Sequence, residues 1–159
     1  MNLMYHSTRN KDLKVTASQA ILQGLSPDGG LFVPEIIPKL TTPIAGLAKM
    51  NYPELAYEVL RLYLTDYTDE EIKDCINKAY DDKFDTPEIA PIKKVGGLHY
   101  LELFHGATIA FKDMALSILP HLLTTAARKS NISDEIVILT ATSGDTGKYT
   151  TQKHPIRVG

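Results

Sequence analysis

The sequence predicts an α/β fold, in which a helical amino-terminal part is followed by the beginning of a domain with a parallel sheet. Two segments between residues 51 and 80 carry apolar residues at helical spacing, each after a capping signal. Residues 98–139 follow the order strand, helix, strand, which is typical of a βαβ unit with a right-handed crossover. With 159 residues, 43% of them hydrophobic, the chain is long enough to bury one core.

The first predicted helix covers residues 17–23. Thr16 or Ser18 can cap its first turn, and Gly24 can end it, because glycine tolerates the left-handed conformation found at helix C-termini. A turn rich in glycine and proline then leads to a short predicted strand over residues 31–33.

Two longer helices are predicted next. Asn51 is the expected cap of the first, with Pro53 in its first turn. The second starts after Thr68, where Thr68 and Glu71 have the spacing of a capping box. Its apolar stripe includes Cys75, so this cysteine is predicted to be a core residue and not a reactive thiol.

A domain boundary is expected in the segment 81–91, which is polar and contains two prolines. It divides the chain into an amino-terminal domain over residues 1–85, the beginning of a second domain over residues 86–147, and an atypical tail over residues 148–159.

Beyond this boundary, a strand is predicted over residues 98–103 and a helix with a broad apolar face over residues 115–126. Pro120 lies inside the helical pattern and is expected to kink or shorten the helix. The β-branched run 136–139 is typical of a strand covered on both faces. The loops after both strands would then lie at the carboxyl edge of a parallel sheet, where such sheets bind ligands.

The charge pattern narrows the choice of partners. The net charge is −2, with both signs interspersed, so the chain offers no basic surface for nucleic acid or for an anionic membrane. One cysteine cannot form an internal disulfide, and the first residues do not have the pattern of a secretion signal. We therefore expect a cytoplasmic protein that binds neither nucleic acid nor membranes.

Lys112 is the first candidate for chemistry. It follows Ala110 and Phe111, between the predicted strand and the predicted helix. An amine attacks a carbonyl group only when it is unprotonated, and apolar surroundings favour the neutral amine. A lysine in a first helical turn can also simply extend its charged end to water. His105 is a second-rank candidate, more typical of a residue that orients a loop.

The segment Ser143-Gly144-Asp145-Thr146-Gly147 is the second candidate, because it follows the last predicted strand and would open a helix. Amides at such a turn can bind a carboxylate or phosphate, although a plain strand-to-helix turn has the same pattern. It is not a nucleotide-binding P-loop, since Thr142 occupies the position of the first glycine. The histidine spacing and the missing Gly-x-Ser-x-Gly motif argue against a zinc site and a serine nucleophile.

Together, residues 101–113 and 138–147 resemble the lysine segment and the substrate-carboxylate loop of threonine synthase, a pyridoxal-phosphate enzyme of the tryptophan-synthase-β-like fold. Residues 24–34 resemble the opening segment of that family, so the likeness extends over residues 1–147. The resemblance implies a parallel-sheet domain that binds pyridoxal 5'-phosphate. It also implies conversion of O-phospho-L-homoserine and water to L-threonine and phosphate.

The resemblance also implies roles for single residues. Lys112 would be the Schiff-base lysine, with Phe111 beside the cofactor. Ser143, Gly144, Asp145, Thr146 and Gly147 would receive the substrate carboxylate. Asp145 takes the place of an asparagine that related enzymes have near the 3-hydroxyl of the cofactor, and no metal is implied.

After Gly147 the resemblance ends, and the family's later phosphate-binding loop is missing from residues 148–159. We therefore expect a truncated chain that is inactive alone and self-associates through unpaired apolar surface. Two alternatives stay open at this point: a catalytically silent folding or interaction module, and a related enzyme that eliminates phosphate without releasing threonine.

Overall fold

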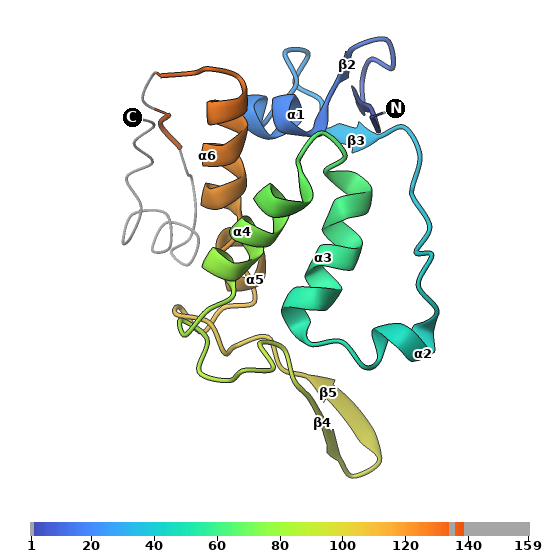
Figure 1. Cartoon of the computed structure of the whole chain (residues 1–159), viewed down its shortest axis with the longest axis vertical. Coiled ribbons are helices and arrows are strands. Elements are labelled where there is room, and N and C mark those ends of the chain that lie inside the picture. Colours follow the sequence, from blue (N-terminus) through green and yellow to red (C-terminus); the bar gives the residue numbers. More distant parts are fainter. Residues whose placement is uncertain (1, 134–135, 139–159) are drawn as a thin grey trace.

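The computed structural model describes residues 2–133 and 136–138 (Figure 1). Helices and small antiparallel sheets alternate along this part of the chain. In chain order the elements are β1 (Tyr5–Ser7), β2 (Lys14–Val15), α1 (Ala17–Gln23), β3 (Phe32–Pro34), α2 (Ile44–Leu47), α3 (Tyr52–Tyr63), α4 (Asp69–Ala79), β4 (Ile92–Val95), β5 (Leu98–Leu101), α5 (Asp113–Leu116) and α6 (Leu119–Lys129).

The helices α1, α3, α4 and α6 form the body of the molecule. Figure 1 shows α6 beside both α1 and α4, while α3 packs on the other side of α4. A three-stranded sheet of order β2-β1-β3 lies next to α1, and both of its pairings are antiparallel. The hairpin β4-β5 extends away from this body at the opposite end.

The predicted helix starts are confirmed. Thr16, Asn51 and Thr68 each accept a hydrogen bond from a backbone amide three residues later, and the side chain of that later residue bonds back to the cap. Each box satisfies two amides that a helix start leaves unpaired. Ser18 is not the cap of α1; its hydroxyl donates to Asp66 Oδ2 at 2.5 Å and so ties α1 to the loop between α3 and α4.

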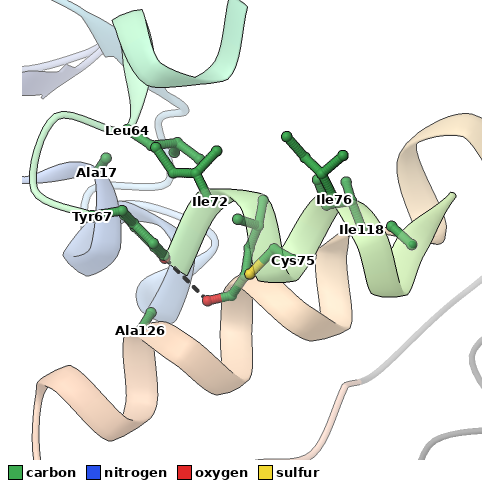
Figure 2. Packing of buried hydrophobic residues seen from close by; sticks show 10 residues of the cluster. Ala17, Leu64, Tyr67, Ile72, Cys75, Ile76, Ile118 and Ala126 are labelled. Carbon is green, nitrogen blue, oxygen red and sulfur yellow. Dashed lines mark hydrogen bonds between the residues drawn. The ribbon is translucent and has the colours of Figure 1, made fainter. Parts of the chain in front are cut away.

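The core lies where α1, α4 and α6 meet (Figure 2). Ile72, Ile76 and Cys75 point from α4 into this core and are each 1% exposed, which confirms the core position of the cysteine. The hydroxyl of Tyr67 donates to the carbonyl oxygen of Leu122 at 3.0 Å, so the buried phenol keeps a partner. The core thus includes residues from both sides of the expected boundary at 81–91.

Pro120 divides the predicted helix, as expected. The segment forms a short α5 and a separate α6, and Pro120 lies in the first turn of α6, where its missing amide costs no hydrogen bond. The unpaired apolar surface expected of a truncated chain does not include the buried face of this helix. Leu122, Leu123 and Ala126 are not left exposed, because they pack against α1 and α4.

The expected βαβ unit is also wrong for the described residues. Leu98–Leu101 pairs with Ile92–Val95 in an antiparallel hairpin, whose turn Gly96-Gly97 has positive φ at both positions. Residues 136–138 adopt no strand. In the hairpin, β5 pairs with its neighbour in the chain, β4, and lies far from residues 136–138. A parallel pair of β5 with residues 136–138 would also lack the further strands that stabilise such a sheet. The exposed apolar residues of the hairpin are Ile92, Val95, Leu98, Tyr100 and Leu101.

Within the described residues, none of the helices combines the length and the apolar character needed to cross a lipid bilayer.

Candidate active site

Lys112 lies at the start of α5, on the wall of a cavity. Its carbonyl oxygen accepts hydrogen bonds from the amides of Ala115 at 3.1 Å and Leu116 at 2.9 Å, which fix its backbone in the first helical turn. The cavity has a volume of about 670 Å³. It is lined by Tyr52, Leu55, Ala90, Leu101, Leu103, Phe111, Lys112, Met114, Ala115 and Leu116.

The lining of this cavity is mostly apolar, because only Lys112 and Tyr52 contribute polar side-chain groups to it. Tyr52 stands at the first turn of α3 and meets Tyr80 edge to face, with ring centroids 4.8 Å apart. Burial raises the pKa of Tyr52, because the surroundings of low polarity disfavour the charged phenolate. A few polar groups in an apolar cavity of this size are typical of a site for a small organic molecule.

The turn that precedes Lys112 is folded back onto α5. Asp113, which is 1% exposed, accepts hydrogen bonds from the amide of Thr108 at 2.7 Å and from its hydroxyl at 2.6 Å. Gly106 lies against the same carboxylate, and a Cβ atom there would be 2.5 Å from Asp113 Oδ2. The close approach therefore requires glycine at position 106.

His105 ties this turn to two other segments. Its Nδ1 is 2.5 Å from Asp85 Oδ1, and its Nε2 is 3.0 Å from Glu102 Oε2. The carbonyl oxygen of His105 also accepts from the amide of Asp85 at 3.0 Å. The bonds to Glu102 and then to Asp85 raise the pKa of His105. This geometry fits a residue that orients the loop.

The residues predicted from the sequence are only partly covered by this description. Phe111 lines the same cavity as Lys112 and is 66% exposed, so most of its side chain is open to solvent. The segment Ser143 to Gly147, with Gly144, Asp145 and Thr146, lies outside the described residues.

Several residues of the cavity and its supports escaped the sequence analysis. Tyr52 and Leu55 belong to a helix far from Lys112 in the chain, and nothing local signals that their side chains reach it. Thr108 and Asp113 stand at the two ends of the lysine turn (residues 108–113), and no periodic pattern in the sequence marks them. The local signal in the sequence was the acidic residue Asp113 directly after the lysine, because a carboxylate among apolar residues needs hydrogen-bond donors nearby if it becomes buried.

Among the described residues, the histidine, cysteine and carboxylate side chains form no cluster that is able to hold a metal ion.

Comparison with known proteins agrees with the resemblance in the sequence. A sequence model of the family described as threonine synthase N terminus matches residues 4–80. The threonine synthase of Schizosaccharomyces pombe is 39% identical over 153 residues, a match that covers 90% of this chain and 30% of the relative. The chain therefore spans about a third of the length of the relatives that it matches.

Solved structures give the same result. The structure of PLP-bound threonine synthase from Brucella melitensis superposes with a TM-score of 0.81 at 29% identity, over 93% of this chain and 32% of that one. Yeast threonine synthase superposes with a TM-score of 0.72 at 37% identity, over 82% of this chain and 27% of that one. The mixed helix and strand architecture is thus that of the first third of these enzymes. In sequence and in fold, this chain is similar to the amino-terminal third of threonine synthases.

Proposed function

We propose that this chain supplies the lysine side of a threonine synthase active site, and that Lys112 is the residue that binds pyridoxal 5'-phosphate. The observation that carries the proposal is the position of Lys112 on the wall of an apolar cavity, within a chain 39% identical to a threonine synthase. The fit to the cofactor is chemical: an amine for its aldehyde, the rings of Tyr52 and Phe111 for its flat ring, and about 670 Å³ of space.

When bound, pyridoxal phosphate supplies an electron sink for negative charge on substrate carbons. The residues of this chain would supply the attachment point and the proton transfers. Lys112 Nζ would hold the cofactor at rest and, once displaced by substrate, would accept and return protons as a general base and acid. The apolar residues Leu55, Leu103 and Met114 would keep bulk water away from that amine.

The substrate would be O-phospho-L-homoserine, and the products L-threonine and phosphate. The amides of residues 143–147 would receive its carboxylate and hold the reacting bonds in place. Because the chain spans about 30% of its relatives, we expect residues 1–159 alone to release neither threonine nor phosphate. The remaining part of the site would come from the segments that correspond to the other two thirds.

The test uses a chimera of residues 1–147 with the remaining carboxyl-terminal part of yeast threonine synthase. After incubation with pyridoxal phosphate and reduction by borohydride, mass spectrometry should find the pyridoxyl group on Lys112. Lys112→Ala should abolish this adduct and turnover, while Lys94→Ala, in the exposed strand β4, should change neither. An unchanged adduct in Lys112→Ala would refute the proposal. Phosphate release without threonine would instead support the elimination reaction.

A further inference from the structure

We propose that Asp113 is a positioning residue, which holds the lysine turn closed and so sets the direction in which Lys112 enters the cavity. The inference rests on the proposed function of Lys112 and adds a second residue to it. Asp113 does not line the cavity, so it acts through the backbone of its neighbour.

The first step is the burial of the Asp113 carboxylate. A carboxylate that is 1% exposed has lost its water and needs donors from the protein. Thr108 supplies two, its amide to Oδ2 at 2.7 Å and its hydroxyl to Oδ1 at 2.6 Å. Bonds of this length to a charged acceptor are the stronger kind of hydrogen bond.

The second step is the closure of the turn. The two bonds join residues 108 and 113, and the amide of Asp113 donates to the carbonyl oxygen of Ala110 at 3.0 Å between them. Ile109 is held with a φ of 64°, a conformation unfavourable for a β-branched residue. Such a conformation persists only where surrounding bonds enforce it, so the Asp113 bonds also hold the strained part of the turn.

The third step connects the turn to the lysine. Lys112 lies inside the closed segment, directly before Asp113 and α5, so its Cα atom is fixed from both sides. Without the side-chain bonds to Asp113, the turn would keep its backbone bonds, such as that from the Asp113 amide to Ala110, but would lose the link that closes it at Thr108. The amine would then sample directions other than the cavity, and displacements of about 1 Å can reduce a rate about 100-fold.

The test uses variants that separate hydrogen bonding from charge. Asparagine at position 113 can accept from the amide of Thr108 and donate to its hydroxyl, so Asp113→Asn keeps both bonds and loses the charge. Asp113→Ala loses both bonds. Thr108→Val loses the hydroxyl bond at a half-buried position, and Thr108→Ser keeps it.

In the chimera described above, we expect Asp113→Ala to lower kcat about 10- to 100-fold with less change in KM. Its lysine adduct should absorb less light at the same cofactor concentration. Asp113→Asn and Thr108→Ser should behave like the parent. The kcat of Thr108→Val should lie between that of the parent and that of Asp113→Ala. Thermal unfolding of each variant reports whether it is folded. If Asp113→Ala does not fold, the comparison of Thr108→Val with Thr108→Ser still tests the inference.

Two outcomes would overturn the inference. One is equal loss in Asp113→Asn and Asp113→Ala, which would assign the effect to charge. The other is a parent-like adduct and kcat in both Asp113→Ala and Thr108→Val. Lys112→Ala keeps the two proposals apart, because its adduct disappears if Lys112 binds the cofactor, whatever the Asp113 variants do.

Discussion

The hydroxyl of Tyr80, at the end of α4, donates a hydrogen bond to the carbonyl oxygen of Met114 in α5 at 2.9 Å. Tyr80 also contacts the ring of Tyr52 in α3 edge to face. The side chain of Tyr80 thus connects α4, which contributes residues to the core, with α3 and α5, whose residues line the cavity. The position of the lysine turn depends on this connection as well as on its own hydrogen bonds.

Replacement of Tyr80 by phenylalanine should lower the free energy of unfolding by about 1 kcal/mol, because the Met114 carbonyl loses its donor while the ring contact remains. Urea denaturation followed by circular dichroism measures the change. Tyr100→Phe is the matched control, since Tyr100 is 51% exposed on the hairpin. An equal loss in both variants would contradict this assignment.

Gly106→Ala should destabilise the protein by about 1–3 kcal/mol, because the new Cβ atom would be 2.5 Å from both Cβ and Oδ2 of Asp113. Thermal unfolding should show a lower Tm. Ala107→Gly alters the same turn at an exposed position without adding an atom, and it should shift Tm less. A Gly106→Ala variant as stable as the parent would show that the turn is able to move away from Asp113.

The contribution of His105 to stability should depend on pH. Hydrogen bonds to Glu102 and then Asp85 raise its pKa above the ordinary 6.5, and Glu88 adds a further negative charge nearby. The folded state therefore binds the proton more tightly, so the stabilisation is complete below about pH 6.5 and is lost as the pH rises through the higher folded-state pKa.

Urea denaturation at several pH values tests this expectation. The difference in free energy of unfolding between the parent and His105→Gln should be larger at about pH 5.5 than at about pH 8.5. Glu102→Gln should reduce this pH dependence while keeping the histidine. A constant difference across the range would mean that His105 acts by packing alone.

Cys75 should resist thiol reagents in the folded protein. Burial raises the pKa of its thiol. Among the hydrogen bonds of the described residues, its Sγ contacts Thr125 Oγ1, at 3.6 Å. At about pH 8 we expect modification to be about 100-fold slower than in urea, since the reagent needs local unfolding. A second cysteine from Ser130→Cys, at the exposed end of α6, should react at once. Rapid labelling of Cys75 would contradict its core position.

Local signals in the sequence predicted much of the fold. Capping boxes at Thr16, Asn51 and Thr68 depend on side chains three residues apart, so they could be recognised without knowledge of the rest of the molecule. The hairpin β4-β5 had such a signal too, because Gly96-Gly97 is suited to a two-residue turn with positive φ. The charged residues Lys93 and Lys94 hid the strand before it, since they break the alternation of polar and apolar residues.

The candidate site was less accessible to sequence reasoning. Lys112 and Phe111 were identified from a local motif, whereas Tyr52 reaches the cavity from a position 60 residues earlier. Which residues meet across such distances depends on how α3, α4 and α5 pack. The bond between Tyr80 and Met114 follows from that packing and from no pattern along the chain.

The composition of the core determines when it can form during synthesis. Ala17 of α1 and Ile72 of α4 share this core with Ile118 and Ala126, which leave the ribosome much later. Before Ile118 and Ala126 are synthesised, the apolar side chains of α4 lack their partners from α6 and remain exposed to water. Such exposure favours aggregation or chaperone binding. The lysine turn is synthesised within this interval. Its closure and the closure of the core therefore belong to the same late stage of folding.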